Sequence, residues 1–483
     1  VYLFYLSNDG LLHAVDTATG QEKWAFMPEE NLAKLAAMKT NAVGEHLIAG
    51  DGSPRLYVVD VDRNGKITSG DKAYLLFSMR RGGRAVYALD VSERDAPRFM
   101  WKVDNNTLGF SELGETWSNP AITRMRTSAD PVAVFAAGYD PVANDQLTVT
   151  INRLATTATV NTPIDHGYVT NEQVTVSGAF QSEYNGTQTI TVTGARSFTY
   201  TVAGSPLTPA TGNIRVESTR AATMGRGVFF VNARTGALIK SFTPAASGGD
   251  NTQVPGMDFS IPSDAVPINT DLDTAGYADR LYLGDLGGNV WRFDIDDPSP
   301  AAWKALKFAD LTNGATPRRR LMFPPAVVKQ LFLDQRFDAV YVGTGDRENP
   351  LRTDNLDYLF MIKDFEIGLS SSQTSPVAFS IGTGTTQFYD LTSNLIQFGT
   401  AAEQTSAKAA LKGTAGWVLR LERGALAGEK VVNAPTVVFN ILSFGTYSPL
   451  VTASACVPPK VSRQPPFVSC KSAGSPPIFG SVR

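Results

Sequence analysis

Short apolar runs that alternate with polar residues recur along the chain, and most of them stand next to Gly, Pro, Asn or Asp. Alternation with a period of two places side chains on opposite faces of a β-strand, and the flanking residues favour turns. Apolar residues at helical spacing are found in two stretches, 28–38 and 401–411. The pattern predicts an all-β protein of many short strands, with two helical excursions between strands.

One motif repeats within this pattern. A glycine-containing turn leads into an alternating strand, which ends on an acidic or amide residue and is followed by Thr-Gly, tryptophan or both. Four copies are clear and two are weaker; they begin at Asn8, Gly82, Gly225, Gly287, Tyr358 and Trp417. One such sheet cannot bury both of its faces, so the copies must stack radially, with tryptophans between neighbouring sheets. The repeat predicts a β-propeller.

The spacing of the copies predicts an insertion. The polar residues that end successive copies are 58 to 74 positions apart, except Asp90 and Asn232, which are 142 apart. The extra stretch is rich in alternating Thr and Val, and Asn185-Gly186 is a hairpin signal. We therefore expect propeller blades over 1–146, a small β-sandwich-like module over 147–216, and further blades with a C-terminal tail over 217–483. The module can be a spacer or a ligand-facing domain.

The segment 60–71 has the pattern of an EF-hand-type calcium loop, although its flanks are strand-like. A hard cation needs six or seven oxygen atoms, and Gly65 at the sixth position permits the sharp bend. The alternative is a solvated acidic turn. The expected ligands are the side chains of Asp60, Asp62, Asn64 and Asp71, the carbonyl of Lys66, and Thr68 acting through water.

A second acidic loop, 271–279, is a weaker candidate for the same chemistry. Its oxygen donors would be the carboxylates of Asp271, Asp273 and Asp279 and the carbonyl of Tyr277. The middle ligand position is Ala275, which has no side-chain oxygen. Three carboxylates that cap a turn are the alternative interpretation.

The segments 8–16, 80–90, 271–294 and 343–350, taken in this order, resemble the PilY/PilC family of type IV pilus tip-associated proteins. The resemblance implies a modified, seven-bladed, quinoprotein-like propeller that binds Ca²⁺ at Asp271, Asp273, Tyr277 and Asp279. It also implies a secreted protein at the pilus tip or cell surface, reached through the periplasm and outer membrane. Its partners would be pilins or minor pilins and a host or abiotic surface, and its role would be pilus assembly, extension–retraction balance and attachment.

Charge and composition argue against several other classes. The formal net charge is −3, which favours neither nucleic acid nor anionic lipid, and no apolar run is long enough to span a bilayer. The three histidines are scattered without zinc-type spacing. Cys456 and Cys470 lie in the Pro/Ser-rich tail, where a disulfide and two free thiols are both compatible with the sequence.

We therefore expect a non-catalytic protein. Two alternatives stay open: a quinone-dependent periplasmic oxidoreductase, which would share the propeller and its Thr-Gly and Trp repeats, and a lectin-like module that binds glycans through calcium.

Overall fold

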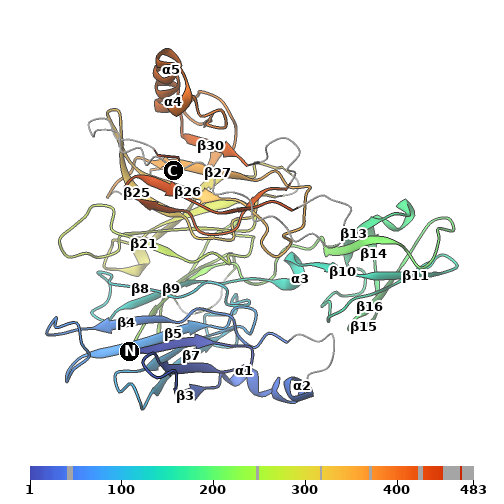
Figure 1. Cartoon of the computed structure of the whole chain (residues 1–483), viewed down its shortest axis with the longest axis horizontal. Helices are drawn as coiled ribbons and strands as arrows, with labels where there is room; N and C mark the ends of the chain where they lie inside the picture. The colour runs from blue at the N-terminus through green and yellow to red at the C-terminus, as the bar shows by residue number, and fades with distance from the viewer. Residues whose placement is uncertain are drawn as a thin grey trace. The chain divides into compact units, whose positions relative to one another are not determined.

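The computed structural model describes residues 1–40, 47–245, 248, 250–315, 318–368, 372–421 and 428–449, and the backbone of 468–469. The chain divides into two compact units (Figure 1). Unit 1 comprises residues 1–138 and 225–483, and unit 2 comprises residues 139–224. The module expected at 147–216 lies within unit 2. Cys456 and Cys470 lie outside the described residues.

Unit 1 is built mostly from small sheets whose strands follow one another along the chain. Sheet 1 contains β1 (Tyr2–Leu6), β2 (Leu12–Asp16) and β3 (Glu22–Phe26). Sheet 2 contains β4 (Arg55–Val59), β5 (Lys72–Ser78), β6 (Ala85–Asp90) and β7 (Arg98–Asp104). Sheet 3 contains β8 (Ala121–Thr123), β9 (Val132–Ala136), β18 (Val228–Asn232), β19 (Leu238–Thr243) and β20 (Asn251–Gln253).

The next two sheets repeat this order and, like sheet 3, carry a parallel fifth strand. Sheet 4 contains β21 (Val266–Ile268), β22 (Arg280–Gly284), β23 (Asn289–Asp294), β24 (Lys304–Asp310) and β28 (Val377–Ala378). Sheet 5 contains β25 (Ala326–Phe332), β26 (Gln335–Gly343), β27 (Tyr358–Asp364), β30 (Gly416–Arg420) and β29 (Phe388–Asp390).

Smaller elements complete unit 1. A two-stranded sheet pairs β31 (Lys430–Val431) with β34 (Thr446–Tyr447), and a three-stranded sheet contains β32 (Thr436–Val438), β33 (Ile441–Ser443) and β35 (Val468–Ser469). The helices are α1 (Glu29–Leu32), α2 (Leu35–Thr40), α4 (Leu395–Phe398), α5 (Ala401–Lys412) and the 3₁₀ turn η2 (Pro300–Ala302). No helix in the described residues is both long and apolar enough to cross a bilayer.

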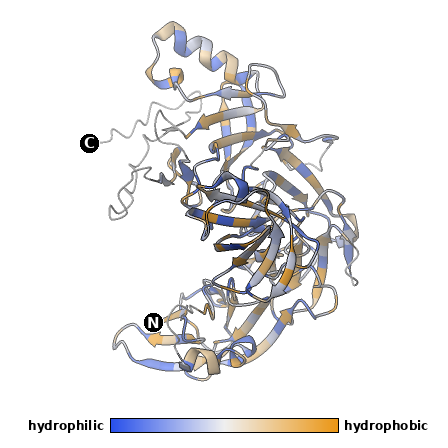
Figure 2. Cartoon of the chain, turned by 90° about the vertical axis from the view of Figure 1, so that its right-hand side faces the viewer, coloured by the Kyte–Doolittle hydropathy of each residue, from blue (hydrophilic) through white to orange (hydrophobic). Residues whose placement is uncertain are grey.

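Hydrophobic side chains fill the spaces between successive sheets of unit 1. In its described part, four clusters join sheet 1 to sheet 2, 2 to 3, 3 to 4 and 4 to 5, and a fifth joins sheet 5 to β31–β33. The alternation of hydrophobic and polar residues along these strands can be followed in Figure 2. Burial on both faces explains why β6 and β23 are almost wholly buried. Face-to-face packing of repeated sheets is the arrangement that the sequence repeat requires.

A tryptophan on the last strand of one sheet ties that sheet to the next. The indole Nε1 of Trp24 donates a hydrogen bond to the carbonyl of Arg94 in sheet 2, and Trp101 donates likewise to Ala233 in sheet 3. The ring of Trp101 also packs on Gly236, where an added Cβ would lie 2.8 Å from it. The Thr-Gly part of the repeat therefore leaves room for the tryptophan of the preceding sheet.

The two weaker copies of the repeat do not start separate sheets. β27 and β30 pair with each other in sheet 5, with Met361 opposite Trp417. A long connection that contains α4 and α5 separates these strands in the sequence. The distance between the two strands along the chain is therefore similar to the length of one repeat, and the sequence pattern predicted a separate copy. The single helix expected at 28–38 is instead two short helices, α1 and α2.

Unit 2 is a small two-sheet domain with its own core. One sheet contains β10 (Gln146–Thr148), β17 (Gly212–Ser218), β13 (Gln173–Ala179) and β14 (Gly186–Thr189), and the other contains β11 (Thr150–Leu154), β12 (Thr157–Asn161), β16 (Ser197–Thr201) and β15 (Thr191–Gly194). Its short helical elements are α3 (Pro141–Asn144) and η1 (Ser182–Tyr184). A single cluster of buried side chains from both sheets forms the core. Asn185-Gly186 follows η1 and is not a two-residue hairpin turn.

Candidate metal centre

The acidic loop 60–71 connects the first two strands of sheet 2, β4 and β5. Gly65 has φ +73° and Gly70 has φ +100°, so glycine suits both positions, while Arg63 adopts a left-handed φ of +57°. An added Cβ at Gly65 or Gly70 would meet nothing within 4 Å. Backbone conformation, and not crowding, therefore favours glycine at the bends of this loop.

The carboxylates of this loop organise its backbone. Asp60 accepts hydrogen bonds from the N–H groups of Asn64 and Gly65, the latter at 2.7 Å. Asp71 accepts from the N–H groups of Thr68, at 2.7 Å, and Val61, at 2.8 Å. These two backbone N–H groups hold the pKa of Asp71 below its ordinary value, so this carboxylate is ionised at neutral pH and can serve as a cation ligand.

Three carboxylates of this loop converge. One oxygen from each of Asp60, Asp62 and Asp71 lies within 4.8 Å of the others, and this is the one such acidic group among the described residues. Asp71 is 4% exposed, whereas Asp62 is exposed. Three ionised carboxylates this close repel one another unless a cation lies between them. Their arrangement therefore suits a divalent cation.

The other predicted ligands of this loop lie nearby, and two of them have protein partners. The amide oxygen of Asn64 accepts from the N–H of Lys66 at 2.7 Å, and the hydroxyl of Thr68 lies 3.0 Å from Asp71 and 3.5 Å from Asp62. The Asn64 oxygen has a second lone pair, so it can keep this bond and still offer a ligand to an ion. The Thr68 hydroxyl is close enough to two carboxylates to orient a bound water.

The second acidic loop, 271–279, connects β21 and β22 of sheet 4, and its carboxylates are not gathered in the same way. Asp279 is 8% exposed and accepts from the N–H and hydroxyl of Thr270 at 2.8 Å each. Asp271 accepts from the N–H of Asp273. The ring of Tyr277 lies under the guanidinium of Arg124, 4.9 Å from its centroid. Each acidic side chain of this loop is thus bound to protein groups.

An arginine in the neighbouring loop of sheet 3 binds the second acidic loop. Arg126 forms ion pairs with Asp273 at 2.6 Å and Asp296 at 2.7 Å. Partial burial opposes ionisation of Asp273, but hydrogen bonds from Gly276 and the charge of Arg126 lower its pKa. The sequence analysis missed Arg126, because its distance of 147 positions from Asp273 leaves no local signal.

The two acidic loops occupy equivalent positions in the repeat, as first-to-second connections of sheets 2 and 4. The first strands of sheets 2, 3 and 4 also contact one another in order, β4 with β8 and β8 with β21. Because equivalent strands are adjacent, equivalent connections project from the same end of the sheets. We call it the acidic end of unit 1.

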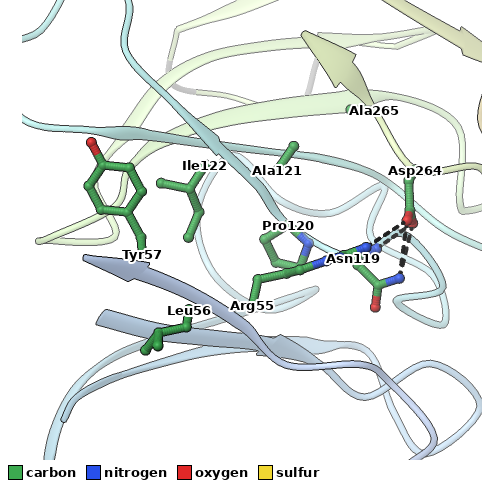
Figure 3. A pocket seen from close by; sticks show the side chains of 9 residues that line it. All are labelled: Arg55, Leu56, Tyr57, Asn119, Pro120, Ala121, Ile122, Asp264 and Ala265. Carbon is green, nitrogen blue, oxygen red and sulfur yellow. Dashed lines mark hydrogen bonds and ion pairs between the residues drawn. The ribbon is translucent and has the colours of Figure 1, made fainter. Parts of the chain in front are cut away.

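Unit 1 has one cavity at the first acidic loop and another at the start of β4 and β8. One, of about 450 Å³, borders Thr68 and Asp71 and extends to Asp90 and Arg98. The other, of about 340 Å³, lies beside β4 and β8 (Figure 3). In it the backbone N–H and side-chain amide of Asn119 donate to Asp264. Its polar groups thus bind one another, and we assign no ligand to it.

The stacked sheets and the acidic loop define a class: a multi-sheet β-protein of propeller type with a candidate divalent-cation loop. No family model matches the chain. It is 34% identical over 136 residues to the type IV pilus biogenesis factor PilY1 of Pseudomonas aeruginosa (strain UCBPP-PA14), a match covering 28% of this chain and 11% of that protein. It is 23% identical over 316 residues to a PilY1 homolog of Xylella fastidiosa, covering 62% of this chain and 14% of that protein.

Among solved structures, the Pseudomonas aeruginosa PilY1 C-terminal domain superposes with a TM-score of 0.53 at 17% identity, covering 93% of this chain and 76% of that one. The chain is thus similar to PilY1 type IV pilus biogenesis factors in part of its sequence, and its fold resembles that of the PilY1 C-terminal domain. The matched part is a small fraction of the length of the curated relatives.

Proposed function

We propose that this chain is the calcium-binding, non-catalytic propeller of a type IV pilus biogenesis factor. The observation that carries the proposal is the convergence of Asp60, Asp62 and Asp71 within 4.8 Å, in a chain that is similar to PilY1 over part of its length. In this proposal unit 1 is a modified, quinoprotein-like propeller of seven blades. The seven sheets found among its described residues support that number.

The similarity to PilY1 supports a proposal for the biological role. We place the protein outside the cell, at the pilus tip or cell surface, in contact with pilins or minor pilins and with the surface to which the cell attaches. It would support pilus assembly and the balance between extension and retraction. This can be tested by deleting the gene in its own bacterium and counting surface pili by electron microscopy. Unchanged pilus number and twitching motility would refute the role.

Calcium would act by closing the loop between β4 and β5. Each carboxylate that accepts N–H groups in the free loop has a second oxygen or lone pair to offer an ion. Binding would remove the repulsion among the three carboxylates and fix the end of β5, whose strand is buried between sheets. The second loop would bind calcium more weakly, since Asp273 is already neutralised by Arg126.

We expect calorimetry to detect Ca²⁺ binding to the purified protein, with a dissociation constant on the order of 10⁻⁴ to 10⁻³ M, as in extracellular EF-hand-type modules. Changing both Asp60 and Asp62 to Asn removes two ligand charges and should weaken binding at least about ten-fold. Asp271→Asn with Asp273→Asn tests the second loop separately.

The control is Asp165→Asn, which removes a carboxylate paired with Arg196 in unit 2. It should bind calcium as the unmodified protein does. If the Asp60/Asp62 double variant takes up calcium with unchanged affinity and stoichiometry, this loop is not the site.

A further inference from the structure

Two loops of unit 1, after β5 and after β26, carry charged side chains that influence one another electrostatically. Arg80 and Arg81 follow β5 in sheet 2, and Arg347 and Glu348 follow β26 in sheet 5. The charges of Arg81 and Arg347 act on the largely buried carboxylate of Glu348, and the charge of Arg347 acts on Arg80. Both loops are second-to-third connections, so they lie at the end of the sheets opposite the acidic end. We call Asp51, Arg80, Arg81, Arg347 and Glu348 the arginine cluster.

Arg80 has a guanidinium without an acceptor. The guanidinium lies 4.7 Å from the centroid of the Trp117 ring, and its Nε is buried without a hydrogen-bond partner. In the part of the chain that the structure describes, the Arg80 side chain makes no hydrogen bond or ion pair. Burial lowers its pKa, and although the charge of Asp51 opposes this, the charges of Arg347 and Arg81 lower the pKa further. An unsatisfied buried donor costs free energy, so an acceptor that is not part of the protein would be stabilising here.

The backbone of Arg80 is also unusual. Its φ is +49°, in the left-handed region that non-glycine residues seldom adopt. The conformation is held by a hydrogen bond from the Arg80 N–H to the carbonyl of Thr116 at 3.1 Å. Residues kept in such a conformation by their surroundings cluster at ligand-binding sites. In this conformation the guanidinium of Arg80 lies over the ring of Trp117.

The arginine cluster contains more arginines than carboxylates. Arg81 is paired with Asp51 through two of its nitrogens, at 2.9 and 2.7 Å. Arg347 is exposed and makes no ion pair among the described residues, its guanidinium lying 5.9 Å from the ring of Phe323. Burial raises the pKa of Glu348, so this carboxylate opposes the cationic field less than an exposed one would. Arg80 and Arg347 are thus the two arginines of the cluster that make no ion pair among the described residues.

We propose that Arg80 and Arg347 bind an oxyanion, the carboxylate or phosphate group of a small ligand, at the end of unit 1 opposite the acidic loops. A guanidinium presents donors in a planar fork that matches both groups. Trp117 holds the plane of Arg80, and the Arg81–Asp51 pair fixes the loop that carries it. The site is independent of calcium and adds a ligand to the proposed function.

The test is isothermal titration of the full chain with citrate and, separately, with inorganic phosphate. Arg80→Gln and Arg347→Gln should each weaken binding at least about ten-fold, because each removes one charge-assisted contact. The control is Arg94→Gln, an exposed arginine paired with its neighbour Asp95, and it should bind normally. Binding of citrate alone identifies a carboxylate ligand, and binding of phosphate alone identifies a phosphate ligand.

Two further variants distinguish a structural role of Arg80 from a role in binding the anion. Arg347 is exposed, so Arg347→Gln should fold normally and still lose binding. Arg80→Lys keeps the charge without the fork and should bind between the unmodified protein and Arg80→Gln. Absence of binding by both anions, or equal binding by Arg347→Gln and the Arg94→Gln control, overturns the proposal.

Discussion

Changing Asp364 to Asn is expected to lower the free energy of unfolding by about 3–5 kcal/mol, because it removes one partner of a buried charge network. Asp364 lies between sheets 4 and 5 and is 2% exposed. Its carboxylate accepts from Arg292 at 2.8 Å, from Arg280 at 3.5 Å and from the hydroxyl of Tyr282. Both arginines are buried, so an amide would leave their charges without full compensation.

Denaturant unfolding monitored by tryptophan fluorescence measures this loss. Asp354→Asn serves as the control, because its carboxylate is 58% exposed and pairs with Arg352 at the surface. Exposed pairs contribute at most about 1 kcal/mol, so the control should unfold near the unmodified protein. Equal stability of the two variants would show that the network between sheets 4 and 5 does not form.

Changing Trp101 to Ala should cost about 3–5 kcal/mol, as expected for a buried tryptophan that leaves a cavity. Trp101 is 6% exposed, packs between sheets 2 and 3, and donates to the carbonyl of Ala233. Without the indole, the Thr-Gly turn of sheet 3 loses its packing partner and this carbonyl loses its donor.

The matched control is Trp24→Ala. Trp24 stands at the equivalent position of sheet 1 and makes the equivalent bond, to Arg94, but it is only partly buried. Its replacement should cost less than half as much, measured by the midpoint of urea unfolding at fixed protein concentration. Similar losses in both variants would mean that burial between sheets does not set the contribution of this tryptophan.

The sequence predicted what depends on local pattern. The strands after Gly82 and Gly287 are β6 and β23, and the loop pattern of 60–71 correctly indicated that the oxygens of Asp60, Asp62 and Asp71 come together. Both features follow from alternation and turn residues within a few positions.

The features that the sequence did not predict depend on contacts between residues that are far apart along the chain. The pairing of β27 with β30 was hidden by the long connection between them, and the ion pair of Arg126 with Asp273 joins two sheets. The charges that surround Arg80 belong to loops of sheets 2 and 5, which alternation and turn signals cannot place together.

The attachment of unit 2 has a mechanical consequence. The chain leaves unit 1 after β9 and returns at β18, and these strands are directly paired, with Ala136 opposite Val228. A pull on unit 2 therefore reaches unit 1 through two adjacent covalent connections. Tension is shared between two hydrogen-bonded strands in the middle of a five-stranded sheet, flanked by β8 and β19. Such an anchorage resists tearing better than a single tether to an edge strand would.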